Sequence, residues 1–163
     1  MRPEPILSLP VGVIMARRQV THGRWTLPSW QAVAALAGER MAQPSAKGVL
    51  VRSGDEIEQY LYTGYRLELH RDGAEGYWFN LAGESPALFV ICHEGPDGDV
   101  APFSVTADPN EASAAMEGDD KVFAVPIPPE VYRQIEEFVV KYYVPRERGK
   151  RKRKDWSREP GSE

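Results

Sequence analysis

Alternating apolar and polar positions along the first half of the chain predict a mostly antiparallel β domain. Residues 8–20 form the first predicted strand, and because both of its alternating sets are small or apolar, we expect it to be central or shared between layers. Residues 25–37 form a second predicted strand, in which Pro28 indicates an edge or a bulge. Shorter strands are predicted over residues 49–51 and 57–62.

The segment from residue 60 to residue 93 has the strongest strand character, and a hairpin is predicted at its centre. Asp72-Gly73 lies between two runs of strand character, and Asp-Gly is a favoured two-residue hairpin turn. This register places one set on a core face: Leu67, Leu69, Trp78, Phe89 and Ile91. It places another set on the opposite face: Arg66, Glu68, His70, Glu75, Tyr77 and Phe79.

The C-terminal third adds two strands and two helices. A turn over residues 95–99 leads into a strand over residues 101–107. Asp108 and Pro109 provide the cap and first position of a short helix ending near Gly118, and a strand over residues 122–127 follows.

The last helix begins near Pro129 and carries one apolar stripe at helical period. Its members are Val131, Ile135, Phe138, Val139 and Tyr142. We expect this helix to act as a lid on the sheet, and Pro145 to end it. The elements together predict an α+β domain: a mostly antiparallel barrel or sandwich of about seven or eight strands, with a short inserted helix and a C-terminal amphipathic helix.

Length and charge divide the chain into a globular body and a tail. The 163 residues suggest one ordinary domain, which we assign to residues 1–145. Residues 146–163 contain eight Lys or Arg against four Asp or Glu, so a tail of charge +4 follows a body of charge −8. The tail has low apolar content, which predicts disorder.

Targeting and redox signals favour the cytoplasm. No apolar run approaches the roughly 20 residues that a membrane span requires. The first residues lack the features of a signal peptide, and Cys92 is the only cysteine, so no intrachain disulfide can form. The sequence leaves the oligomeric state open.

One cluster could hold a metal ion. In the predicted register His70, Glu75 and Cys92 lie side by side on three adjacent strands, and imidazole, carboxylate and thiolate groups are zinc ligands. The alternative is a cross-strand surface pair of His70 and Glu75 with Cys92 as a small buried hydrophobe. The chain has neither a glycine-rich phosphate loop nor a Gly-x-Ser-x-Gly motif, so we expect no catalytic activity and no bound cofactor.

The basic tail is the second candidate binding feature. Its candidate residues are Arg146, Arg148, Lys150, Arg151, Lys152, Arg153, Lys154 and Trp156. A run of this kind binds phosphates by counterion release or docks on an acidic partner, and a nearby Trp can anchor an interface. The alternative is a tail that only keeps the protein in solution.

Several segments resemble a proteobacterial family of uncharacterised proteins that is often encoded beside formate dehydrogenase subunits. They are residues 9–13, 30–33, 67–72, 77–81, 105–112, 125–129 and 150–153. The resemblance implies a role in maturation or assembly of a molybdenum or tungsten formate dehydrogenase, with the enzyme or its maturation factors as partners. We therefore expect a non-catalytic accessory protein; the alternatives are a nucleic-acid or other polyanion-binding module that acts through the tail, and a metal-binding protein.

Overall fold

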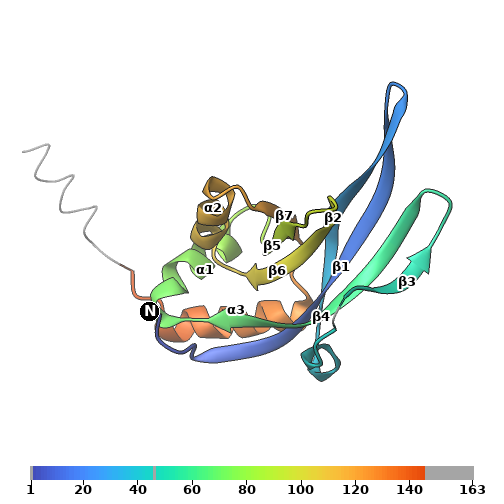
Figure 1. Ribbon diagram of the computed structural model, residues 1–163. Coiled ribbons are helices and arrows are strands. Elements are labelled where there is room, and N and C mark those ends of the chain that lie inside the picture. Colours follow the sequence, from blue (N-terminus) through green and yellow to red (C-terminus); the bar gives the residue numbers. More distant parts are fainter. Residues whose placement is uncertain (1, 46, 146–163) are drawn as a thin grey trace, which may run out of the picture.

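Two antiparallel sheets and three helices make up the structure, a computed structural model that describes residues 2–45 and 47–145 (Figure 1). The larger sheet has the strand order β2-β1-β4-β3. Its strands are β1 (Leu7–His22), β2 (Trp25–Ala37), β3 (Val49–Ser53) and β4 (Ile57–Leu69). Short 3-10 turns, η1 (Glu39–Ala42) and η2 (Arg71–Gly73), follow β2 and β4.

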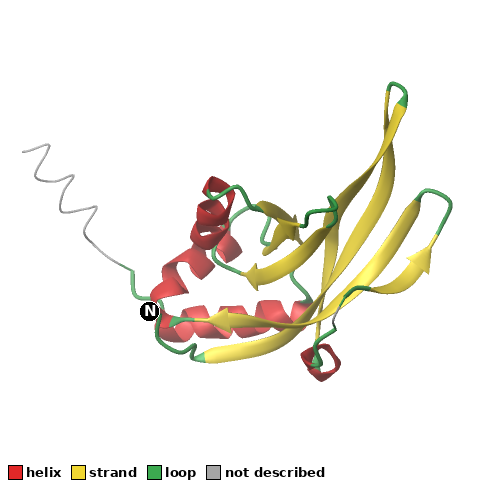
Figure 2. Ribbon diagram, in the orientation of Figure 1, coloured by secondary structure: helices red, strands yellow, loops and turns green. Residues whose placement is uncertain are grey.

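The second half of the chain supplies the smaller sheet and the helices (Figure 2). The smaller sheet has the order β6-β5-β7. Its strands are β5 (Leu88–Glu94), β6 (Val100–Thr106) and β7 (Lys121–Val125), and the helices are α1 (Ala74–Ala82), α2 (Pro109–Glu117) and α3 (Pro129–Tyr142). The predicted α+β class is confirmed, and the described strands form a sandwich-like pair of open sheets instead of a closed barrel.

The two predicted N-terminal strands are confirmed, and they pair as an antiparallel hairpin. β1 lies in the middle of its sheet between β2 and β4, as its two-sided apolar pattern indicates. β2 is an edge strand, which explains how Pro28 is tolerated, because a proline cannot donate to a further strand. A bulge opposite the Ile14–Met15 step shifts the register, so Ala32 and Ala35 are the buried residues of β2.

The strand predicted over residues 57–62 is longer in the structure, because a bulge allows β4 to continue through Gly64 to Leu69. The φ of Gly64 is +96°, a conformation that glycine adopts without steric cost, and a Cβ atom here would lie 2.5 Å from Cα of Pro44. Gly12 faces it across the bulge, where a Cβ atom would meet Sδ of Met41 at 2.6 Å. The two glycines therefore let η1 and the loop after it pack closely on this face of the sheet.

The predicted hairpin at Asp72-Gly73 is wrong, because the chain turns there into helix α1. Gly73 has φ −93°, so the positive φ of a two-residue hairpin turn is absent. The helix is fixed by tertiary contacts. Tyr77 is buried and its Oη accepts a hydrogen bond from N of His70 at 2.9 Å, and Asn80 bonds N and O of Ala87 and O of Ala107.

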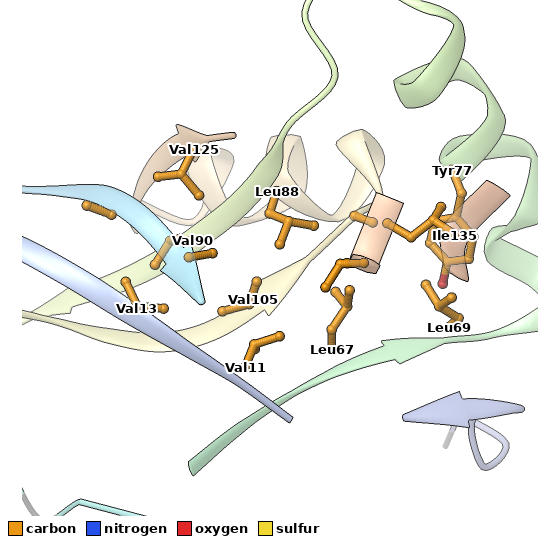
Figure 3. Packing of buried hydrophobic residues seen from close by; sticks show 14 of the residues in the cluster. Val11, Val13, Leu67, Leu69, Tyr77, Leu88, Val90, Val105, Val125 and Ile135 are labelled. Atoms are coloured by element: carbon orange, nitrogen blue, oxygen red, sulfur yellow. The ribbon is translucent and has the colours of Figure 1, made fainter. Parts of the chain in front are cut away.

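The hydrophobic core lies between the two sheets and continues under α1 and α3 (Figure 3). Val11 and Val13 of β1 approach Val90 and Val105 of the smaller sheet, and all four are at most 5% exposed. Farther along, Leu67 and Leu69 lie close to Tyr77 of α1 and Ile135 of α3 (Figure 3). The core face predicted for residues 67 and 69 is therefore correct, and the C-terminal helix covers it.

Both predicted helices are confirmed. Asp108 caps α2 by accepting a hydrogen bond from N of Asn110, Pro109 is the first helical residue, and Gly118 ends the helix. The apolar stripe of α3 is buried at Val131, Ile135, Phe138 and Val139. The order of elements thus follows the sequence pattern everywhere except at α1.

Candidate partner-binding surfaces

The structure separates the three residues of the predicted metal cluster. Glu75 lies on the exposed side of α1, so the three adjacent strands that brought it beside His70 and Cys92 do not exist. Within residues 2–45 and 47–145, no three His, Cys, Asp or Glu side chains are grouped so that they could hold a metal ion.

Cys92 and His70 are both core residues. Cys92 is fully buried in β5, and burial raises the pKa of its thiol to about 12. It is therefore a protonated thiol at neutral pH, which is a poor nucleophile and a poor metal ligand. The His70 ring is 6% exposed; its Nε2 lies 3.3 Å from Oε1 of Glu68, and its Nδ1 has no hydrogen-bond partner among the described residues.

A polar groove of about 340 Å³ runs between β4 and β6 and includes His70 in its lining. Arg2 crosses one end, where it pairs with Asp72 at 3.1 Å and with Glu111. Glu111 in turn accepts a hydrogen bond of 2.6 Å from Oγ1 of Thr106. The charged groups at this end are bonded to one another, and these bonds hold the N-terminal segment against η2 and α2.

Aromatic side chains from α1 and the end of α3 form a cluster of Trp78, Phe79 and Tyr143. Tyr142, which packs against Phe138, precedes Tyr143 in the chain, and we call these four residues the aromatic patch. The Trp78 ring stacks on Tyr143 with centroids 5.2 Å apart and an angle of 14°, and Phe79 lies edge-on to Trp78 at 5.1 Å. Phe79 is 58% exposed and Trp78 is 38% exposed. Two cations flank the patch, because Arg71 and Lys141 lie 5.0 and 5.4 Å from the Tyr142 ring centroid.

Sequence reasoning missed this patch because it treated residues 77–79 as a strand. Strand alternation put Trp78 in the core with Tyr77 and Phe79 opposite, whereas helix α1 buries Tyr77 and turns Trp78 and Phe79 outward. The available signal was the helical spacing of Ala74, Tyr77 and Asn80, all of which are buried.

A second apolar surface lies on the larger sheet, where the two hairpins extend beyond the smaller sheet (Figure 1). β3 is an edge strand whose five residues are all exposed, and three of them are apolar: Val49, Leu50 and Val51. At the tip of the β1–β2 hairpin, Trp25 and Leu27 are 72% and 52% exposed.

The basic tail lies outside the described residues. All eight predicted binding residues belong to it: Arg146, Arg148, Lys150, Arg151, Lys152, Arg153, Lys154 and Trp156. The last described residue, Pro145, comes two positions after Tyr143, so the basic sequence follows the aromatic patch directly along the chain. None of the described helices is long and apolar enough to cross a membrane.

The fold defines an α+β domain of two facing antiparallel sheets with a helical cover. The chain belongs to the family described as "Protein of unknown function (DUF3305)", which matches residues 10–153. Comparison with curated proteins gives no match, and comparison with solved structures gives none. The match covers both sheets, all three helices and most of the basic run.

Proposed function

We propose that this protein is a non-catalytic accessory protein that binds a partner protein through the aromatic patch. The observation that carries the proposal is the exposure of Phe79 and Trp78 on a rigid helix, beside the cations Arg71 and Lys141. Aromatic and arginine side chains dominate the energy of protein interfaces because they bury a large area at little entropic cost. Packing against Tyr143 fixes the Trp78 ring before a partner arrives, which lowers that cost further.

The proposed partner is a molybdenum or tungsten formate dehydrogenase, or a factor that matures it. This part of the proposal rests on the family resemblance, whose segments include residues 77–81 and therefore the exposed aromatics. A maturation factor must hold its client without transforming it, and a patch of fixed aromatic rings supports that role.

A pull-down with mass spectrometry tests the interaction. We expect the full chain to retain formate dehydrogenase subunits or maturation factors from cells that express the enzyme, and Phe79→Ala to reduce their recovery strongly. Phe103→Ala is the matched control, because Phe103 is 61% exposed on β6 and also contacts one aromatic ring, that of His93. Equal recovery with both variants would show that the aromatic patch is not the binding surface.

A deletion strain tests the biological role. We expect loss of the gene to lower formate dehydrogenase activity and the metal content of the purified enzyme, and the wild-type chain to restore both. Normal activity and metal content in the deletion strain would contradict the formate dehydrogenase part of the proposal, whatever the pull-down retains.

A second candidate function is binding of nucleic acid or another polyanion. The observation that favours it is the position of the basic sequence, which begins directly after the aromatic patch and its two cations. Basic segments bind phosphates, and aromatic rings stack on unpaired bases. Removing residues 146–163 should abolish binding to single-stranded oligonucleotides and its salt dependence. Unchanged binding by the shortened chain would show that the tail is not the segment that binds the oligonucleotide.

A further inference from the structure

The outer edge of β3 is an open site for strand pairing. β3 is the last strand of its sheet, so the backbone N–H and C=O groups on its outer side have no strand to pair with in the described part of the chain. Val49, Leu50 and Val51 are 56%, 51% and 50% exposed. Val51 is the residue that a bulge leaves without a partner in β4.

The two edges of this sheet differ in how they are protected. On the opposite edge, β2 carries Pro28, which cannot donate a hydrogen bond and so prevents a further strand from adding there. β3 contains no proline, and its only charge is Arg52. Short length and the bulge limit its pairing, but the centre of the strand remains three consecutive apolar residues.

Charge around β3 is arranged so that the segment complements itself. Lys47 precedes the apolar residues, and Asp55 and Glu56 follow them; all three are exposed. An antiparallel copy reverses this order. With a two-fold axis at Val51, Val49 faces Ser53 of the other copy, and the Lys47 end of each β3 meets the turn of the other copy that holds Asp55.

We propose that β3 pairs with β3 of a second copy of this chain, joining the two larger sheets into one eight-stranded antiparallel sheet. A two-fold arrangement uses the same edge of both molecules and closes, so it removes the open edge without starting a fibre. It gives the apolar residues of β3 cross-strand neighbours and twice brings Lys47 of one copy toward Asp55 of the other. This inference does not depend on the proposed function, because β3 and the aromatic patch lie at opposite ends of the molecule (Figure 1).

Sedimentation equilibrium of the full chain, with charge variants, tests the pairing. We expect a dimer whose dissociation constant rises at least about tenfold in Lys47→Asp and in Asp55→Lys, since each change places like charges opposite one another twice. The double variant Lys47→Asp/Asp55→Lys restores opposite charges and should regain most of the lost affinity. Leu50→Asp should also weaken the dimer, whereas Leu27→Asp, which is 52% exposed on the other edge strand, should not.

Disulfide trapping tests the register. Cys92 is fully buried, so Val51→Cys introduces the one accessible thiol of the described residues. Directly opposite residues of an antiparallel pair lie within the Cα separation that a disulfide requires. We expect Val51→Cys to form a covalent dimer on mild oxidation and Leu27→Cys to remain monomeric. The proposal would be overturned if the wild-type chain were monomeric at all concentrations, or if both cysteine variants formed covalent dimers in equal yield. It would also be overturned if β3 paired only after another protein was added.

Discussion

The two halves of the larger sheet are built from the same strands but have opposite surroundings. Where β1 and β4 face the smaller sheet and α3, Val11, Val13, Leu67 and Leu69 have no exposed surface. Where the same strands continue into the two hairpins (Figure 1), residues 21–29 and 49–56 are exposed throughout. We call these regions the covered half and the uncovered half.

The difference shows that strand pairing and burial are separate requirements. Continuous antiparallel pairing carries β1 and β2 from the core to the hairpin tip at His22 and Trp25. Within the described part of the chain, no second sheet or helix packs on the uncovered half. The sequence marks the transition, because the apolar positions of β1 end at Arg17 and Arg18. Stability is therefore expected to depend on the covered half, and exposed apolar residues of the uncovered half are free to serve an interface.

The largest predicted effect compares one leucine from each half. Leu67→Ala should lower the free energy of unfolding by about 3 kcal/mol, because it removes buried methyl groups and leaves a cavity between β4 and the helices. Leu27→Ala should change it by less than about 0.5 kcal/mol, because the side chain is 52% exposed. Urea denaturation at low protein concentration measures both changes in the free energy of unfolding. Similar losses for the two variants would mean that Leu27 is also buried in solution, so that the uncovered half is not exposed.

A smaller effect is predicted at the boundary between the halves. Gly64→Ala should destabilise the protein by about 2 kcal/mol, because φ is +96° and the new methyl group would lie 2.5 Å from Cα of Pro44. Gly54→Ala, in the turn of the uncovered half, is the matched control: a Cβ atom there meets only O of Ile57 at 3.5 Å. We expect its effect to stay below about 1 kcal/mol. If the control were the more damaging change, neither the φ of Gly64 nor its close approach to Pro44 would constrain this position.

Most of the fold could be predicted because local pattern and tertiary environment agree. The alternation in β1, the proline of β2 and the stripe of α3 each determined an element that the structure confirms. α1 could not be predicted in this way, because its aromatic residues have strand propensity and its helical state depends on distant groups. Asn80 bonds the backbone of Ala87 and Ala107, and Gly76 packs against Asp108; these contacts have no local signature.

The candidate site depended on that one element. Placing residues 74–82 in a strand created the expected cluster of His70, Glu75 and Cys92 and hid the exposed face of Trp78 and Phe79. The hydrophobic pattern also could not predict that β3 is an edge strand, because the sequence of residues 49–51 does not indicate whether another strand pairs with its outer side. The sequence pattern alone therefore predicts the strands and helices of the fold better than it predicts which side chains are exposed on its surface.

The smallest predicted effect concerns Asp108, the N-cap residue of α2, which is 7% exposed. Burial raises the pKa of this carboxyl, an effect that outweighs the hydrogen bond from N of Asn110, which lowers it. A carboxyl with a raised pKa in the folded state binds protons more tightly there than in the unfolded state. Its contribution to stability is thus complete below its ordinary pKa of about 4 and is lost as pH rises through the raised value.

Asp108→Asn isolates this contribution, because asparagine keeps the oxygen that caps α2 but does not titrate in this range. The stability of the wild type relative to the variant should therefore fall as pH rises above about 4, the ordinary pKa of the group. Chemical denaturation at a series of pH values measures the difference, with Asp97→Asn, in the exposed turn between β5 and β6, as the control. A difference that does not change with pH would mean that Asp108 is as well solvated in the folded protein as the exposed Asp97, in contradiction to its 7% exposure.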